Sequence, residues 1–251
     1  MIFDLDGTLA ESKSDLDTEM ATLLRELLRR KKVAVIGGGV YKLFQRQFLS
    51  KLRAPKNLLE NLFLFPTTST AFYRYSRGGW RQVYIKKLTA KEKKGIREAF
   101  KKTFEELRYS HPKKVYGQLI EDRGTQVSFS ALGQKAPTHL KKEWKKHNTP
   151  IKLKIAKTMQ KHLPNLEIMA AGNTTIDITH KGIDKEYGIG QIKKYVGVSL
   201  KDMIFIGDAL FAGGNDSAAL RTGIPCFAVD GPGETKKLIA ALLSNEKRVK
   251  T

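Results

Sequence analysis

Two short apolar runs, Val33–Ile36 and Met203–Ile206, constrain the fold of this chain more than any other feature. A strand without polar residues is typical of a parallel sheet, because helices then cover both of its faces. A helical pattern follows each run, and strands alternate with helices towards both ends of the chain. This alternation predicts an α/β fold in which crossover helices connect the strands of a parallel sheet.

The middle of the chain, residues 87–181, shows a different pattern. Thr89–Arg108 and Pro137–His162 predict helices, the second with a break at Pro150. Each helix precedes two strand-like segments that are separated by a turn containing glycine. Helix, two strands, helix, two strands is the pattern of an α+β unit of ordinary domain size. We therefore predict that this stretch is a separate domain inserted into the core.

The composition allows a core of residues 1–86 and 182–251 with a smaller inserted domain. With 251 residues, of which 41% are hydrophobic, the chain can bury a sizeable interior. It has no apolar stretch long enough to cross a bilayer, and its first residues carry carboxylates where a signal peptide carries positive charge. Cys226 is the only cysteine and cannot form an intramolecular disulfide, so we expect the protein to be located in the reducing cytoplasm.

The formal net charge of +21 is typical either of a protein with a polyanionic partner or of a solvated basic surface. The lysines lie largely in amphipathic helical stretches such as Lys86–Lys102 and Lys141–Lys161. Neither zinc-finger spacing nor an aromatic RNA-binding motif accompanies them. We favour the solvated surface, with non-specific adhesion to nucleic acid at low salt. A basic nucleic-acid-binding protein with an inactive core is the alternative of another class.

The first predicted strand, Ile2–Leu5, leads into the motif Asp4–Thr8, in which one leucine separates Asp4 from Asp6. Two carboxylates at the end of a buried strand repel each other unless a cation lies between them, and Mg²⁺ prefers such oxygen ligands. Asp4 can attack phosphorus to form a covalent intermediate. Asp6 can protonate the leaving oxygen and then activate water or another hydroxyl. The alternative role of the motif is to cap a helix.

A second apolar strand also ends in an aspartate, Asp208. Parallel strands end at the same edge of a sheet, so Asp208 can complete the metal site that Asp4 begins. Asn215 and Asp216 open the next predicted helix. They either orient the metal ligands by hydrogen bonds or cap that helix.

Lys185 and a glycine turn add groups that suit a phosphate. Lys185 stands just before a predicted helix and can neutralise a phosphoryl group during its transfer. Taken alone, it would be assigned to the surface. Gly37 and Gly38 lie where a strand passes into a helix, and their backbone N–H groups can bind phosphate. Glycine triplets also occur in plain turns.

In this order and spacing the four motifs resemble those of the haloacid dehalogenase superfamily, and the resemblance covers nearly the whole chain. The inserted domain is similar to the C2 cap of its subfamily IIB. The long gap between Asp208 and Asp216 resembles the fourth motif of the eukaryotic-type phosphomannomutase branch. Val35–Gly38 is similar to the second motif of that branch, and Gly172–Asp177 to its return from cap to core.

The resemblance implies a Rossmann-like parallel-sheet core with a C2-type cap, and it implies roles in the core. Asp4 would be the nucleophile and a Mg²⁺ ligand. Asp6 would be the acid/base and would bind the metal through its carbonyl. Asp208 would be the third protein ligand of the metal, and Lys185 would pair with the phosphoryl group.

The resemblance further implies that Arg123, Thr175 and Asp177 contact the substrate from the cap. Gln134 stands where the mutases carry a second phosphate-binding arginine. A mutase must hold a bisphosphate at both ends, which calls for strong cations with bidentate geometry. The replacement of this arginine therefore counts against mutase activity more than against phosphatase activity.

We therefore expect a Mg²⁺-dependent phosphatase that hydrolyses a small phosphorylated metabolite, a sugar phosphate, through an aspartyl-phosphate. The alternative enzyme is a phosphomannomutase-type hexose phosphate mutase. The resemblance also implies a homodimer formed through the cap. Only three residues precede Asp4, so we expect that Met1 is internal or that the natural start lies upstream.

Overall fold

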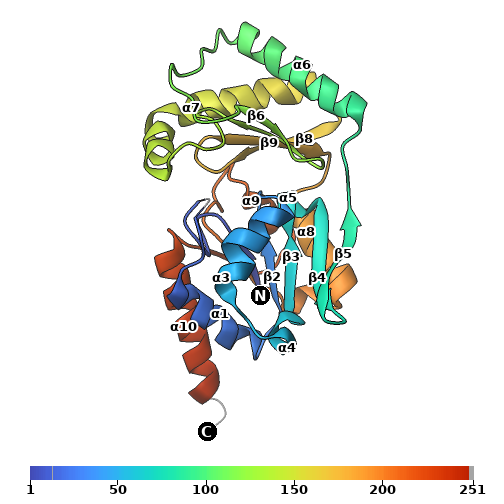
Figure 1. Ribbon diagram of the computed structural model, residues 1–251, viewed down its shortest axis with the longest axis vertical. Helices are drawn as coiled ribbons and strands as arrows, with labels where there is room; N and C mark the ends of the chain where they lie inside the picture. Colours follow the sequence, from blue (N-terminus) through green and yellow to red (C-terminus); the bar gives the residue numbers. More distant parts are fainter. Residues whose placement is uncertain (13, 249–251) are drawn as a thin grey trace. The chain divides into compact units, whose positions relative to one another are not determined.

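The computed structural model describes residues 1–12 and 14–248 and divides the chain into two compact units (Figure 1). The larger unit, here called the core, comprises Met1–Ile85, Lys185–Ala212 and the segment that begins at Asp216. The smaller unit, here called the cap, comprises Lys86–Asp184 and Gly213–Asn215. Each unit has its own sheet and its own hydrophobic interior.

The core is built on a seven-stranded sheet with the strand order β11-β10-β1-β2-β3-β4-β5. The strands from β11 to β3 are parallel, and β4 and β5 extend the sheet as antiparallel strands. The predicted parallel-sheet core is therefore confirmed. The strands are β1 (Ile2–Asp4), β2 (Val33–Ile36), β3 (Leu62–Phe65), β4 (Ala71–Ser76), β5 (Gly79–Ile85), β10 (Phe205–Gly207) and β11 (Cys226–Ala228).

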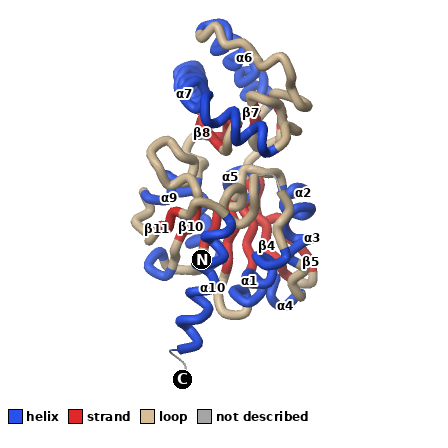
Figure 2. Tube along the Cα trace, turned by 90° about the vertical axis from the view of Figure 1, so that its left-hand side faces the viewer, coloured by secondary structure: helices blue, strands red, loops and turns tan. Residues whose placement is uncertain are grey.

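Helices cover both faces of the core sheet. Alternate residues of each strand point to opposite faces, and the apolar side chains on both faces are buried beneath these helices. Phe3 and Val35 belong to a buried cluster with residues of α1 and α10, whereas Ile2 and Ala34 belong to a cluster with residues of α8 and α9. Figure 2 shows α1, α9 and α10 around the strands of this sheet. The helices are α1 (Thr18–Leu28), α2 (Tyr41–Leu43), the π-helix Phe44–Leu49, α3 (Ser50–Leu52), α4 (Lys56–Leu59), α5 (Pro66–Ser69), α8 (Lys185–Val196), the 3₁₀ helix Leu200–Asp202, α9 (Ser217–Leu220) and α10 (Pro232–Arg248).

One edge strand, β5, was not predicted. It follows β4 through a turn at Gly78, where the backbone has a φ of +77° that glycine adopts more readily than other residues. Arg81 and Gln82 are exposed within it, and the strand is only partly buried along its length. An edge strand of this kind lacks the continuous apolar run by which the buried strands were recognised.

The cap consists of an antiparallel sheet with the strand order β6-β7-β9-β8 and two long helices. Phe100 of α6, Ile155 of α7 and Phe129 of β7 share one buried cluster, so the helices pack on one face of this sheet. The cap elements are α6 (Ala90–Glu106), β6 (Ile120–Asp122), β7 (Val127–Ser130), α7 (Thr138–His162), β8 (Leu166–Ala171) and β9 (Thr175–His180).

Local signals explain where two of the helices begin. The Asp17 carboxylate accepts a hydrogen bond of 2.9 Å from the N–H of Met20 and caps α1. At α6, Thr89 and Glu92 exchange hydrogen bonds between their side chains and backbone N–H groups, which is a capping box. Such caps satisfy N–H groups that have no partner within the helix.

The predicted break at Pro150 is wrong, because α7 continues through this residue. Proline lacks the N–H that would bond to the carbonyl four residues earlier. Two side chains just before the proline donate to carbonyls one turn earlier: Asn148 Nδ2 donates to the Trp144 carbonyl at 3.0 Å, and Thr149 Oγ1 donates to the Lys145 carbonyl at 2.7 Å. Packing on the cap sheet on both sides of the proline offsets the lost backbone bond.

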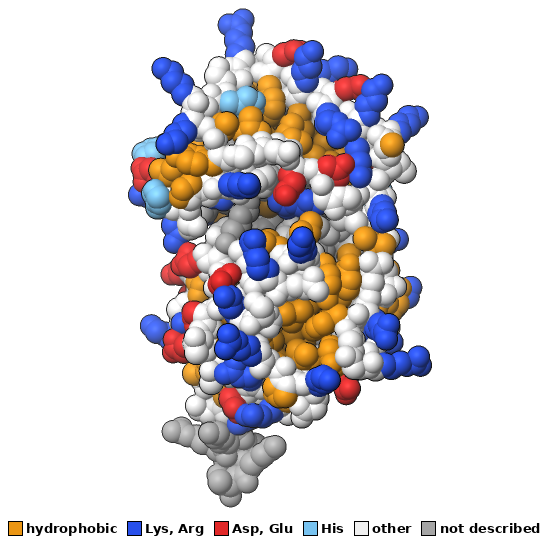
Figure 3. Space-filling model, in the orientation of Figure 1, with side chains coloured by type: hydrophobic (Ala, Val, Ile, Leu, Met, Phe, Trp, Pro, Cys, Tyr) orange, Lys and Arg blue, Asp and Glu red, His pale blue; other side chains and the backbone are white. Residues whose placement is uncertain are grey.

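Basic side chains are scattered over the visible face of both units (Figure 3). This distribution agrees with a solvated basic surface. Among the described residues, no helix has the length and apolar character needed to span a bilayer. The Met1 amine donates to the Lys32 carbonyl at 2.8 Å, and Met1 lines a cavity of about 410 Å³. The expectation about the natural start of the chain stays a prediction.

Lys152 of α7 is an unusual lysine, because its side chain is buried and only 6% of the residue is exposed. Its Nζ donates to the Gly172 carbonyl at 2.8 Å. Burial lowers the pKa of Lys152 to about 8, with a further decrease from Lys145 and an opposing effect of Asp177. The charged form is therefore destabilised in the folded cap.

Replacing this lysine, Lys152→Met, should increase the free energy of unfolding more at pH 7 than at pH 10. The folded-state pKa lies below the unfolded value, so the penalty is full below pH 8 and fades as the pH approaches 10.5. We expect the difference between the two pH values to be about 2 kcal/mol. Urea unfolding followed by circular dichroism measures it.

Lys154→Met is the matched control, because Lys154 is exposed on the same helix. If both variants showed the same pH-dependent increase in the free energy of unfolding, the increase would not arise from the buried charge of Lys152.

Candidate active site

Two aspartates lie side by side at the carboxyl edge of the core sheet. Asp4 is the last residue of β1, and Asp208 directly follows β10. The two strands are adjacent and parallel, with Ile2 opposite Phe205 and Phe3 opposite Ile206. The register of the sheet therefore places both carboxylates at one edge, as the sequence predicts for strands that end in aspartate.

Lys185 connects this edge to the helix layer. It is the first residue of α8, and only 1% of its surface is exposed. Its Nζ donates to Oδ1 of Asp4 at 2.5 Å and also to Oδ1 of Asp216. The other oxygen of Asp216 accepts the N–H of Ala209 at 2.9 Å. Asp216 thus fixes the Lys185 ammonium group against Asp4, a role that the sequence left open between orientation and capping.

The charges at this edge are unbalanced. Burial raises the pKa of Asp4 well above its ordinary range; the positive charge of Lys185 opposes this shift, while Asp216 and Asp208 add to it. Burial also disfavours the charged form of Lys185, but Asp216 and Asp4 outweigh it and hold its pKa above its ordinary value. One ammonium group therefore faces three carboxylates, which leaves room for further positive charge.

This carboxylate set fits a divalent cation. Oxygen atoms of Asp4, Asp208 and Asp216 all lie within 4.8 Å of one another. Both oxygens of Asp216 already accept protein hydrogen bonds, so Asp4 and Asp208 are the better carboxylate ligands. Hard oxygen donors of this kind suit Mg²⁺. Asp6, which forms an isolated β-bridge with Ala10, stays predicted to bind the metal through its carbonyl.

Two glycines allow the acidic groups to approach the backbone. Gly7 has a φ of +91°, and a Cβ atom there would lie 2.5 Å from Oδ2 of Asp208. At Gly207 a Cβ atom would overlap the carboxylate of Asp216. A side chain at either position would therefore displace an aspartate of the site. Thr8 adds a hydrogen bond of 3.5 Å from its Oγ1 to Oδ1 of Asp208.

The two glycines predicted to bind phosphate differ in their surroundings. The N–H of Gly37 donates to the Phe65 carbonyl at 3.1 Å and so continues the contact between the β2 and β3 segments. This N–H is therefore engaged within the core, and the phosphate-binding role predicted for Gly37 and Gly38 is not tested by this contact. That role stays a prediction.

A strained segment beside this turn was not predicted. Thr67, Thr68 and Ser69 follow β3 with φ values of +48°, +52° and +70°, and all three are buried. Non-glycine residues rarely adopt this conformation, and such strain gathers at functional sites. The N–H groups of Thr67 and Thr68 donate to the carbonyls of Gly39 and Gly37, each at 2.9 Å. No glycine or asparagine marks this segment in the sequence.

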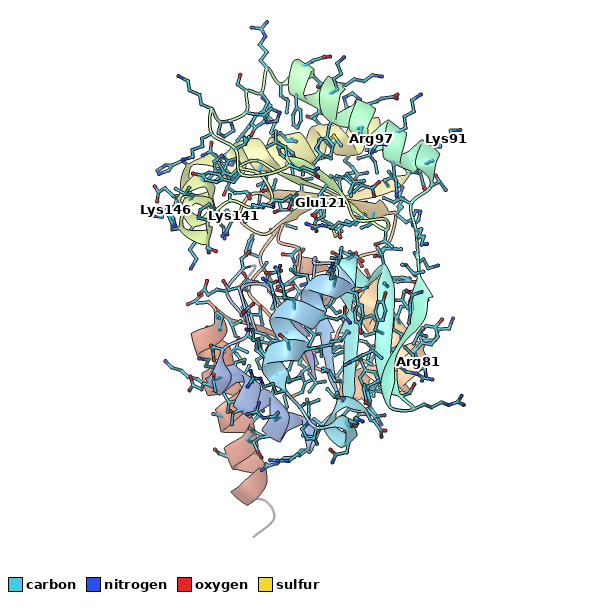
Figure 4. The ribbon with its side chains drawn as sticks, in the orientation of Figure 1. Arg81, Lys91, Arg97, Glu121, Lys141 and Lys146 are labelled. Carbon is cyan, nitrogen blue, oxygen red and sulfur yellow. The ribbon has the colours of Figure 1, made fainter. Side chains whose placement is uncertain are left out.

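The cap brings together Arg123, Gln134 and Asp177, three of its predicted site residues. The guanidinium group of Arg123 donates to Gln134 Oε1 at 3.3 Å and lies 3.8 Å from Asp177 Oδ1. It also donates from Nε to Oε2 of Glu121 at 2.7 Å. Glu121 was not among the predicted site residues; it lies on β6 (Figure 4).

The remaining predicted site residues also belong to the cap. Thr175 lies on β9 opposite Ser130. Asn215 belongs to the cap unit, whereas its neighbour Asp216 belongs to the core. The roles of Thr175 and Asn215 therefore stay predictions.

The variant Lys185→Met should lower the free energy of unfolding at pH 7 by about 3–5 kcal/mol, because it leaves buried carboxylates without their cation. Chemical unfolding in the presence of a chelator measures the loss. Lys193→Met on the exposed side of α8 is the control and should change little. Equal losses in the two variants would contradict the assigned role of Lys185.

The core and cap together have the fold of several solved phosphatases. The IMP-bound, N-terminally truncated IMP-nucleotidase of Plasmodium falciparum has a TM-score of 0.71 and 16% identity, with 97% of this chain and 67% of that chain covered. A trehalose-6-phosphate phosphatase of Aspergillus fumigatus has a TM-score of 0.53 and 14% identity, with 97% and 91% covered. At these identities the likeness shows the haloacid dehalogenase fold.

Sequence relatives narrow the assignment. The phosphomannomutase of Saccharomyces cerevisiae is 23% identical over 249 residues, which cover 97% of this chain and 94% of the relative. The phosphomannomutase of Encephalitozoon cuniculi is 27% identical over 225 residues, with 86% and 81% covered. The model of the eukaryotic phosphomannomutase family matches residues 20–245. The chain therefore belongs to the eukaryotic phosphomannomutase family of the haloacid dehalogenase superfamily.

Proposed function

We propose that this protein is a Mg²⁺-dependent phosphatase that hydrolyses a small phosphorylated metabolite through an aspartyl-phosphate on Asp4. The contact of Asp4 with the buried ammonium group of Lys185, beside Asp208, carries the proposal. A bound Mg²⁺ ion would supply positive charge for the phosphoryl oxygens. The remaining chemistry belongs to the side chains.

In the first step, an oxygen of Asp4 forms a bond to phosphorus, and the bond between phosphorus and the ester oxygen breaks. Asp6 donates a proton to the departing oxygen, which leaves as an alcohol. Lys185 keeps the Asp4 carboxylate oriented and offsets the negative charge of the phosphoryl group. Asp216 holds Lys185 in this position through its own carboxylate.

In the second step, Asp6 accepts a proton from water, and the water oxygen attacks the phosphorus of the aspartyl-phosphate. The bond between phosphorus and Asp4 breaks, which restores the carboxylate and releases inorganic phosphate. The same residues would serve a mutase if Asp6 deprotonated a sugar hydroxyl instead.

The names of similar proteins support a small phosphate ester as the substrate. Relatives are named phosphomannomutases, and structural neighbours are named IMP-nucleotidase and trehalose-6-phosphate phosphatase. We infer a sugar phosphate as the substrate. We also infer a cytoplasmic enzyme that forms a homodimer through the cap and binds nucleic acid only non-specifically.

A hexose phosphate mutase is the second candidate, because the eukaryotic phosphomannomutase model matches most of the chain. The product that forms distinguishes the phosphatase reaction from the mutase reaction. Release of phosphate from mannose 1-phosphate without added bisphosphate supports the phosphatase. Formation of mannose 6-phosphate that is stimulated by a hexose bisphosphate supports the mutase.

Asp4→Asn should lower kcat by about a thousandfold or more, because the amide cannot form the acyl phosphate. A panel of sugar phosphates assayed for phosphate release with Mg²⁺ measures the loss, and a chelator should abolish the wild-type activity. Asp15→Asn is the matched control, since Asp15 is exposed and pairs with the exposed Lys51.

Three outcomes of this panel are informative. Loss of turnover in Asp4→Asn but not in Asp15→Asn supports the proposal. Turnover that persists in Asp4→Asn excludes Asp4 as the nucleophile. A wild-type protein as inert as Asp4→Asn towards every ester would instead favour the nucleic-acid-binding alternative with an inactive core.

A further inference from the structure

The hairpin formed by β4 and β5 in the core carries positive charge without negative charge. The stretch 61–91 contains six lysines and arginines but no aspartate or glutamate. Arg74, Arg77 and Arg81 lie in the hairpin, and all three side chains are exposed. Among the described residues, no carboxylate forms an ion pair with any of these arginines. Their positive charge is therefore not offset by the protein itself.

Two of the arginines face each other across the hairpin. Arg74 of β4 lies directly opposite Arg81 of β5, the edge strand of the sheet. In such a pair the Cβ atoms are about 4.5–5.5 Å apart, and like charges destabilise the sheet. A charged side chain on an edge strand can prevent pairing with another chain, but Arg74 lies on an inner strand, between β3 and β5. Protection of the edge therefore explains Arg81 and leaves Arg74 unexplained.

A phosphate group between the two side chains would remove this repulsion. The guanidinium group of arginine is planar, always charged and able to bind phosphate through two parallel hydrogen bonds. Arg77, in the turn between the two strands, provides a third cation. Several cations along one hairpin suit a chain of phosphates better than a single phosphate ion, because each phosphate contact adds to the affinity. The charge of the hairpin therefore fits a nucleic-acid backbone.

Trp80 adds an aromatic ring at the same edge of the sheet. It precedes Arg81 on β5 and is only partly buried. Its ring forms an edge contact with the ring of Tyr75 on β4, with a centroid distance of 5.7 Å and an interplanar angle of 77°. Trp80 and Arg81 point to opposite faces, but a ligand along the outer side of the last strand can contact both. Figure 4 shows Arg81 on this side of the core.

An exposed aromatic ring beside cations favours a single strand over a duplex. The bases of a single strand are free to stack on an aromatic side chain, whereas those of a duplex are already stacked on one another. Stacking is tolerant of sequence, because every base has an aromatic face. The edge of the hairpin thus combines the two groups that such binding uses, cations for the backbone and a ring for the bases.

We propose that the outer edge of the β4–β5 hairpin binds single-stranded nucleic acid without sequence preference. Arg74 and Arg81 bind the phosphate backbone, and Trp80 stacks on a base. This surface gives the non-specific nucleic-acid binding of the protein a defined location and a preference for single strands. It does not depend on the reaction at Asp4, so the two proposals are tested separately.

Fluorescence anisotropy of a labelled oligo(dT) of about 15 nucleotides tests the arginines, since sites of this type cover about 4–16 nucleotides. The double variant Arg74→Gln/Arg81→Gln should raise the dissociation constant about tenfold. It should also lower the slope of log Kd against log salt concentration by about 1.4, because two phosphate contacts are lost.

Lys154→Gln/Lys157→Gln is the matched control for this double variant. Both lysines are exposed on α7, and the change in net charge is the same. The control should alter neither the affinity nor the salt slope appreciably, and circular dichroism checks that each variant is folded. Equal effects of the two double variants would overturn the proposal, because the total charge and not the hairpin would then determine binding.

The fluorescence of the two tryptophans, Trp80 and Trp144, tests the stacking. Trp144→Leu leaves Trp80 as the only tryptophan, and oligo(dT) should then quench the fluorescence. Trp80→Leu leaves Trp144, which packs in the cap, and should abolish the quenching. It should also weaken binding about tenfold through the loss of one stacked base. Quenching that persists in Trp80→Leu would contradict the role of Trp80.

Two further ligands separate the alternative partners. A DNA duplex of the same length should bind more weakly than the single strand, and tighter binding of the duplex would overturn the proposal. Phosphatidylserine vesicles test a membrane as the partner. If they sediment the wild type but not the arginine double variant, while both bind oligo(dT) equally, the hairpin binds a membrane and the proposal is wrong.

Discussion

The ammonium group of Lys185 between Asp4 and Asp216 is the interaction on which the core site depends. It connects the end of β1, the start of α8 and the segment that leads into α9, so three separate parts of the chain meet at one buried cation. Burying a charge is costly unless it is paired, and breaking one member of such a set leaves the others unpaired. The same contact that stabilises this edge also orients the proposed nucleophile and opposes the rise in the pKa of Asp4 that burial causes.

The balance of positive and negative charges in the cap differs from that in the core. In the core, carboxylates outnumber the single ammonium group, which fits an additional cation. In the cap, the carboxylates of Glu121 and Asp177 lie beside the guanidinium group of Arg123 and offset its charge. The difference matters for function, because a phosphatase needs strong positive charge only where phosphorus reacts, whereas a mutase also needs it at the far end of a bisphosphate.

Much of the fold was predictable because burial leaves a direct trace in the sequence. Val33–Ile36 has no polar residue, and the structure contains a strand with these bounds. The prediction failed where tertiary packing overrides local preference. The edge strand Gly79–Ile85 has no continuous apolar run, and α7 continues through Pro150 because packing on the cap sheet holds both of its sides together.

The sequence by itself determined which reactive groups the core contains. Asp4 and Asp208 stand at the ends of buried strands and Lys185 at the start of a helix, and the strands of a parallel sheet end at one edge. Only the tertiary structure decided how these groups are paired. In the folded chain, Asp216 accepts a hydrogen bond from Lys185, and the N–H of Gly37 donates to the Phe65 carbonyl. Thr67–Ser69 adopt a left-handed conformation, and Glu121 accepts a hydrogen bond from Arg123. These contacts join residues by register, burial and side-chain direction, which spacing along the chain does not specify.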